Sequence, residues 1–295
     1  MNDQKNTILA IVLSAIVLIG WQYFIGMPQM ERQRQEALLR QQQAQQAKPP
    51  QAAPSPAAPA GAAPRPPGQA DVTTPAEQKS REAALGASER IPIETPSVKG
   101  SIALKGGRLD DISLSRYHET VDPNSPAIVL LSPSGSPHPF YAEFGWVGGA
   151  GANVKAPGPD TVWQREGAGP LTPERPIALV YDNGEGLKFR RTISVDDKYL
   201  FTLRDEVANS TAAPVTLYPY ALISRHGLPQ TSGYYILHEG LIGVMGDQGL
   251  QEVTYKTIED KKSLVFKATD AWMGITDKYW AATLLPNTDA QVQAH

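Results

Sequence analysis

The chain has 295 residues, a formal net charge of -3 and no cysteine. This length allows one large domain or two ordinary ones, and the near-neutral charge gives no electrostatic basis for binding nucleic acid. The lack of cysteine excludes disulfides, thiol catalysis and thiolate metal ligands, but it does not indicate a cellular compartment.

The first element in chain order is an uninterrupted apolar segment at residues 8–25, which reads ILAIVLSAIVLIGWQYFI. As a helix it would be about 27 Å long, enough to cross the hydrocarbon core of a bilayer. It has no polar face, unlike a buried core helix, and no small-residue cleavage site follows it, unlike a signal peptide. We therefore expect a tail at residues 1–7 and an uncleaved membrane helix at 8–26. The expected anchoring residues are Ile8, Leu9, Ile11, Val12, Leu13, Ile16, Val17, Leu18, Ile19, Trp21, Tyr23, Phe24 and Ile25.

Residues 27–88 read as a helical stub followed by a linker. Glu, Arg, Gln and Ala dominate residues 30–46 and favour a helix that frays. Residues 48–75 are rich in Pro, Ala and Gly, so they cannot bury enough apolar area to offset the entropy of ordering. In a polyproline conformation this stretch would reach about 85 Å at most. We expect a tether here, with an SH3-type ligand as the alternative for such a composition.

The charges that flank the apolar segment leave its orientation in the membrane ambiguous. Lys5 and the terminal amine lie on one side, and Arg32, Arg34 and Arg40 lie on the other. By the positive-inside rule alone, this count would place the long part of the chain in the cytoplasm.

From about Glu89 onward, apolar residues alternate with polar ones and turn residues separate the runs, which predicts strands. The clearest run extends from Leu187 to Val195, between the turn signals at 182–184 and 196–198. The other expected strands lie at 98–104, 112–114, 140–146, 177–181, 199–203, 215–218, 234–237, 241–244, 252–255, 264–266 and 272–275.

This pattern predicts an all-β fold, a large antiparallel β-sandwich over residues 89–295. No convincing amphipathic helix separates the runs, and parallel sheets need crossover helices, so the pairing should be mainly antiparallel. A propeller would need a blade-length repeat, which the sequence lacks. An apolar segment at 279–285 is followed by nothing that would close the sheet, so we expect the domain to be C-terminally incomplete.

Signatures of catalysis or cofactor binding are scarce. No two histidines lie three or four residues apart, so no metal site is indicated, and no phosphate loop or dinucleotide fingerprint occurs. We expect no cofactor. The carboxylates of the pairs Asp110-Asp111 and Asp196-Asp197 cannot act together unless a bulge intervenes, because neighbouring residues on a strand point to opposite faces. Both pairs are expected to form turns.

One cluster could carry acid–base chemistry on a sugar: Arg225, His226, His238 and Glu239. The structural alternative is that Glu239 begins a turn and that His238 forms a hydrogen bond at a strand end. Fold-level analogy is weak support for catalysis, so the structural interpretation is favoured.

Several ordered blocks resemble the YidC membrane protein insertase family of Gram-negative bacteria. The tail at 1–6, the apolar segment and Trp21-Gln22 are similar to the first membrane helix of that family, and the Pro/Ala/Gln tether follows there too. Other similar blocks lie at 106–112 with Tyr117, at 191–199, at 235–243 and, most specifically, at 272–280, which reads WMGITDKYW.

The resemblance implies a cytoplasmic N-terminus, an inner-membrane helix and a large periplasmic domain with a supersandwich fold similar to galactose mutarotase. It implies that the whole protein helps to insert, fold and assemble integral inner-membrane proteins, alone or with the Sec translocon, and that it is not an enzyme. The implied partners are nascent inner-membrane proteins, the lipid bilayer, and the SecYEG and SecDF components.

The family's insertion bundle, five further helices around a polar groove with an essential arginine, has no counterpart in this sequence after Ile25. This portion is therefore expected to anchor and dock. Two alternatives remain open: a membrane-anchored periplasmic carbohydrate-binding or mutarotase-like protein, and a structural adaptor of a secretion complex.

Overall fold

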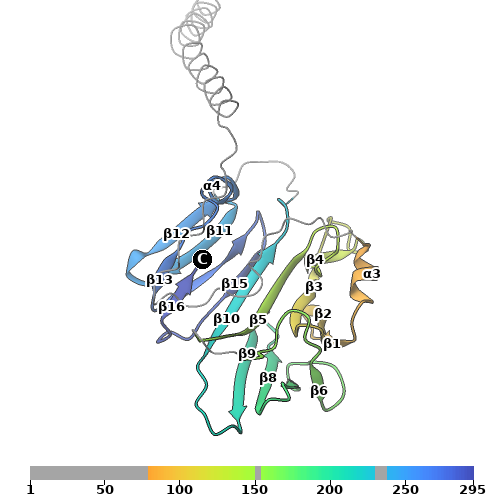
Figure 1. Ribbon diagram of the computed structural model, residues 1–295. Helices are drawn as coiled ribbons and strands as arrows, with labels where there is room; N and C mark the ends of the chain where they lie inside the picture. The colour runs from red at the N-terminus through yellow and green to blue at the C-terminus, as the bar shows by residue number, and fades with distance from the viewer. Residues whose placement is uncertain (1–78, 150–153, 230–237) are drawn as a thin grey trace, which may run out of the picture. The chain divides into compact units, whose positions relative to one another are not determined.

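The computed structural model describes residues 79–149, 154–229 and 238–295, and Figure 1 shows their arrangement. These residues all belong to one unit of the chain. The expected membrane helix, the tether and the strand expected at 234–237 lie outside the described residues. Within the described ranges, no helix is long and apolar enough to cross a membrane.

The first sheet is antiparallel and has six strands among the described residues, with the order β1-β2-β3-β5-β10 and with β4 paired to β3. Its strands are β1 (Arg90–Glu94), β2 (Val98–Ala103), β3 (Arg108–His118), β4 (Ala127–Leu131), β5 (Phe140–Gly148) and β10 (Leu217–Arg225).

The second sheet is a four-stranded antiparallel meander that packs face to face with the first. Its strands are β6 (Gln164–Glu166), β7 (Ile177–Asp182), β8 (Leu187–Val195) and β9 (Phe201–Asn209). Alternate residues of β8 are buried, as the sequence pattern predicts. The rings of Trp146 on β5 and Phe189 on β8 meet across the core with centroids 5.0 Å apart. One apolar cluster includes inward residues of both sheets, which confirms the antiparallel sandwich.

A further group of strands follows β10. A four-stranded sheet has the order β12-β11-β14-β15, and a two-stranded sheet pairs β13 with β16. In Figure 1 β15 lies beside β10, the last strand of the first sheet. The bounds are β11 (Gly240–Met245), β12 (Leu250–Thr254), β13 (Phe266–Ala268), β14 (Ala271–Thr276), β15 (Ala281–Leu284) and β16 (Val292–Ala294), with short helices α3 (Arg81–Leu85), η2 (Gly246–Gln248) and α4 (Tyr255–Lys261).

Three local expectations differ from the structure. Tyr255 begins α4 instead of ending a strand, because the Thr254 hydroxyl caps the helix by accepting a hydrogen bond from Thr257 N at 3.1 Å. The segment after residue 285 does contain a strand, since β16 pairs with β13. Asp110 and Asp111 lie inside β3 and do not form a turn.

The two aspartates of β3 share one face because of a bulge. Ser101 of β2 pairs with Asp111, and the next residue, Ile102, pairs with Leu109, so Asp110 is the extra residue. A bulge sets two residues opposite one, so both carboxylates lie on the side of Ser101, away from the core residues Ile102 and Leu109.

Candidate functional site

An ion-paired cluster joins the end of β10 to the later strands. Arg225 Nη1 lies 2.6 Å from Asp277 Oδ2, and the guanidinium carbon lies 4.2 Å from the centre of the Phe140 ring. The Tyr255 hydroxyl donates a hydrogen bond to Asp277 Oδ1 at 2.8 Å. Burial and this carboxylate raise the pKa of the Tyr255 hydroxyl, so it stays protonated and remains a donor. Asp277 thus connects β10, α4 and the turn between β14 and β15.

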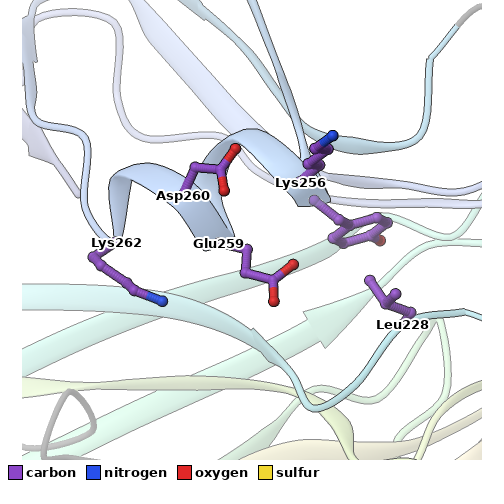
Figure 2. A pocket seen from close by; sticks show the side chains of 6 residues that line it. Leu228, Lys256, Glu259, Asp260 and Lys262 are labelled. Carbon is purple, nitrogen blue, oxygen red and sulfur yellow. The ribbon is translucent and has the colours of Figure 1, made fainter. Parts of the chain in front are cut away.

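A groove of about 610 Å³ opens beside α4. Figure 2 shows the Glu259 side chain of α4 extending toward the side where Leu228 lies, with Lys262 directly after the end of the helix. Leu228 is 69% exposed. The lining therefore combines charges of both signs with an apolar wall, from Leu228, Tyr255, Lys256, Glu259, Asp260 and Lys262.

A smaller pocket of about 250 Å³ adjoins the groove and shares Leu228 with it. The backbone of His226 donates to the Pro139 carbonyl at 2.9 Å, and its ring centre lies 5.9 Å from that of Tyr141. Burial lowers the pKa of His226, so the ring is neutral at pH 7. The lining residues are His138, Pro139, Phe140, Arg225, His226, Gly227, Leu228 and Pro229.

The four residues of the sugar-site hypothesis are only partly brought together. Arg225 and His226 line the smaller pocket, whereas His238 and Glu239 line neither of the two pockets. His238 Nε2 lies 3.0 Å from the carbonyl oxygen of Leu241, near the start of β11. This contact favours the structural interpretation of His238.

Sequence reasoning did not single out Tyr255 or Asp277. Asp277 lies in the block at 272–280 that carries the family resemblance, and this block was the only feature of the sequence that could have pointed to it. Tyr255 carried no comparable signal, because its partner is distant in the sequence.

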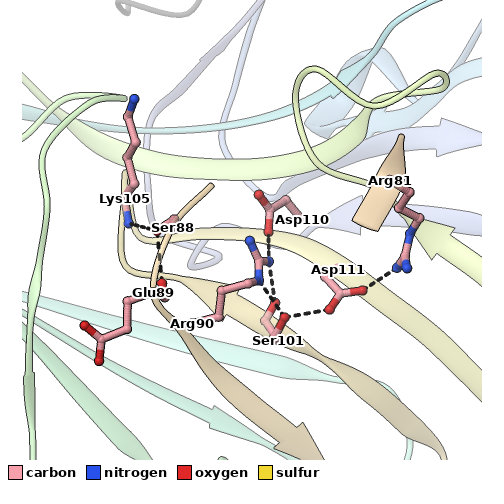
Figure 3. Close-up of polar contacts among 8 residues, drawn as sticks. All are labelled: Arg81, Ser88, Glu89, Arg90, Ser101, Lys105, Asp110 and Asp111. Atoms are coloured by element: carbon pink, nitrogen blue, oxygen red, sulfur yellow. Dashed lines mark hydrogen bonds and ion pairs between the residues drawn. The ribbon is translucent and has the colours of Figure 1, made fainter. Parts of the chain in front are cut away.

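A row of charged side chains covers the outer face of the first sheet (Figure 3). Asp111 pairs with Arg81 of α3 and accepts a hydrogen bond from the Ser101 hydroxyl at 2.6 Å. Arg90 donates to the Ser101 hydroxyl at 2.6 Å and pairs with Asp110. Burial raises the pKa of Asp110, although Arg90 opposes this effect. The bulge in β3 therefore lets Ser101 connect two ion pairs.

The same face continues across β5 and β10. Arg108 Nε donates to Glu143 Oε2 at 2.7 Å, and the Tyr220 hydroxyl donates to Glu143 Oε1 at 2.9 Å. Glu143 is only 2% exposed, so both partners are needed to offset the loss of its hydration. Burial and Glu143 raise the pKa of Tyr220, which therefore remains a donor. These contacts hold strands together and leave no carboxylate free for chemistry within this group.

Known proteins resemble this chain over its whole length. A sequence model of the family described as YidC periplasmic domain matches residues 90–295. The membrane protein insertase YidC of Bradyrhizobium diazoefficiens is 58% identical over 301 residues, covering 100% of this chain and 48% of that protein.

The proteins of the same name from Nitrobacter hamburgensis and Rhizobium meliloti are 59% and 45% identical over 294 and 289 residues. These two matches cover 100% and 97% of this chain and 46% and 47% of the relatives. This chain thus spans about half the length of the curated relatives that it matches. The extent of the family match and the identity along the whole chain show that this protein belongs to the YidC family and contains its periplasmic domain.

Proposed function

We propose that this chain acts as the N-terminal part of a membrane protein insertase, a transport and assembly protein rather than an enzyme. The observation that carries the proposal is the 58% identity to a membrane protein insertase across 100% of this chain. In this proposal residues 8–26 anchor the chain in the inner membrane, residues 27–88 act as a tether, and the sandwich docks in the periplasm.

Topology is the first point to test, because the flanking arginines alone would suggest the opposite orientation. The chain contains no cysteine, so single cysteines can be placed by Asn2→Cys and Gln46→Cys without a background signal. In intact spheroplasts, a membrane-impermeant maleimide should label the cysteine at position 46 and should reach the one at position 2 only after lysis. The reverse labelling pattern would refute a cytoplasmic N-terminus.

We further propose that insertion depends on parts of the relatives that this chain does not match. In lipid, each polar group of a crossing segment that lacks a hydrogen-bond partner costs several kcal/mol of free energy. An insertase must therefore offer the segment a polar path through the bilayer. Proteoliposomes should hold either this chain or the full-length Bradyrhizobium diazoefficiens relative, and protease protection of a small inner-membrane protein should be measured. We expect insertion by the relative and only background with this chain. Equal insertion by both would overturn the proposal.

The proposed partners are nascent inner-membrane proteins and the SecYEG and SecDF components. A photoreactive amino acid at Leu228, beside the groove, would report on docking there. The same probe at Val162, which is 65% exposed and lies next to the sandwich core residue Trp163, is the matched control. Crosslinks to Sec components from position 228 but not from 162 would support docking through the groove. Equal crosslinking from both positions would argue against it.

A further inference from the structure

Aromatic side chains from three distant segments meet at the surface. The ring of Tyr117, near the end of β3, has its centre 5.0 Å from that of Trp280 and 6.5 Å from that of Tyr199. Tyr199 and Leu200 lie in the turn between β8 and β9, while Tyr279 and Trp280 lie between β14 and β15. Four of these five residues are well exposed, at 46% for Tyr117, 36% for Tyr199, 49% for Leu200 and 74% for Tyr279. The five residues are called the aromatic patch below.

The backbone at Tyr199 is strained. The Asp196 carboxylate accepts hydrogen bonds from the backbone of Lys198 at 2.7 Å and Leu200 at 2.9 Å, which closes a three-residue hairpin loop. The last loop residue, Tyr199, has a φ of 74°, at a position where such loops favour glycine or asparagine. Strain of this kind is often found at functional sites, because a residue with better geometry could otherwise occupy the position.

Each exposed tyrosine of the patch follows a basic residue: Arg116 precedes Tyr117, Lys198 precedes Tyr199 and Lys278 precedes Tyr279. The ammonium nitrogen of Lys278 lies 5.4 Å from the centre of the Tyr279 ring. Close to the patch in sequence, the Asp196 carboxylate accepts hydrogen bonds within its own loop and Asp277 pairs with Arg225. The patch therefore combines amphipathic rings with basic residues that neighbour them in the chain, with Lys198 and Lys278 in turns and Arg116 near the end of β3.

We propose that the aromatic patch contacts the lipid headgroups of the membrane in which the chain is anchored. Tyr and Trp rings favour the interface between hydrocarbon and water, and Lys and Arg are attracted to anionic headgroups. The inference rests on the proposed membrane anchor, since a tether of at most about 85 Å would keep the patch at a high effective concentration near lipid.

A cysteine-directed fluorophore can test this contact in the full chain, which has no native cysteine. The environment-sensitive dye NBD is attached to Tyr279→Cys, and the chain is reconstituted into vesicles of phosphatidylethanolamine with phosphatidylglycerol. We expect a blue shift of the emission and quenching by headgroup spin-labelled lipid. Val162→Cys is the control. Val162 bridges to Lys105, just before the start of β3, whereas Tyr117 lies near the other end of that strand, about 30 Å from Arg108 at the rise of an extended chain.

One double variant and one change of lipid examine the cause of the signal. Tyr199→Gly, combined with Tyr117→Ser, removes two rings while relieving the strained φ, so the hairpin should still close. Near-ultraviolet circular dichroism checks that the fold is retained. We expect the quenching at position 279 to be lost in this variant. We also expect it to weaken in phosphatidylcholine vesicles, which lack anionic lipid.

The possible outcomes separate the patch from the anchor. If the chain does not float with vesicles, the membrane anchor is wrong, and the inference fails with it. If the chain floats but the dyes at positions 279 and 162 are quenched equally, the anchor stands and the patch inference is refuted. A blue shift at position 279 that requires added SecYEG or SecDF would mean that the patch binds protein, and this also refutes lipid contact.

Discussion

Arg191 occupies an inward position of β8 and is fully buried, with 0% exposure. Its Nε and Nη2 atoms donate to the two carboxylate oxygens of Asp205 on β9 at 2.8 and 2.9 Å. The guanidinium carbon also lies 5.2 Å from the ring centres of both Trp146 and Trp163. A buried cation is tolerated when a bidentate carboxylate neutralises it, and aromatic faces add further stabilisation.

Removal of this carboxylate should therefore be costly. We predict that Asp205→Ala lowers the free energy of unfolding by about 3 kcal/mol, because it leaves the Arg191 charge buried and unpaired. Urea denaturation measures the change. The control is Glu206→Ala on the same strand, whose ion pair with Arg190 is almost half exposed and should contribute less than about 1 kcal/mol. Equal losses in the two variants would show that Arg191 does not depend on Asp205.

His226 should give the protein a specific dependence on pH. Burial lowers its pKa in the folded state below the usual value of 6.5. As the pH falls below 6.5, the unfolded chain takes up a proton before the folded chain does, so stability falls with pH until the lowered pKa is reached. His226→Gln should flatten this slope. The urea midpoint of each protein is measured from pH 7.5 down to the lowest pH at which it still folds. If the dependence of the midpoint on pH is the same in both proteins, His226 is not its source.

At the scale of elements, the alternation of apolar and polar residues predicted the strands that have one buried face. The pattern gave β8 its observed bounds, Leu187–Val195, because every second residue packs into the core. The bulge in β3 could not be predicted, since it depends on the pairing of Asp111 with Ser101 in another strand. Short strands such as β4 and β16 were missed for the same reason, because their pairing partners and not their own patterns define them.

The pairing of β5 with β10 depends on a residue without a side chain. Gly145 pairs with Tyr220, and a Cβ atom at Gly145 would lie 2.8 Å from three atoms of the Tyr220 side chain. We predict that Gly145→Ala lowers the free energy of unfolding by about 1–3 kcal/mol, because the ring must move away from Glu143. In Gly158→Ala the added Cβ has no neighbour within 4 Å, so this control should change stability little. Similar decreases in melting temperature for both variants would show that the close approach of Tyr220 to Gly145 does not matter for stability.

At the scale of the whole molecule, the sequence predicted the sandwich and the family but not the site. Residues 225 and 226 were singled out and do line one pocket, yet the ion pair of Arg225 with Asp277 joins segments about fifty positions apart. Contacts over such separations leave no periodic pattern in a single sequence. The membrane helix has a strong local pattern, but it lies outside the described residues, so its anchoring role stays a prediction.

The Arg225–Asp277–Tyr255 cluster should couple the later strands to the sandwich. Both ion-paired side chains are largely buried, with 15% exposure for Arg225 and 12% for Asp277. Asp277→Ala would leave a largely buried cation and a half-buried hydroxyl without their acceptor, which costs about 3 kcal/mol.

We predict that this loss is local, because Asp277 is not one of the buried residues that form the sandwich core. Hydrogen exchange should show faster exchange in β11, β14 and β15, while β7 and β8 keep their protection. Asp247→Ala removes an exposed carboxylate of η2 and should leave both regions unchanged. If β7 and β8 lose protection together with the later strands in Asp277→Ala, the described residues unfold as one cooperative unit. The cluster would then stabilise the whole domain and would not act as a joint between two parts of it.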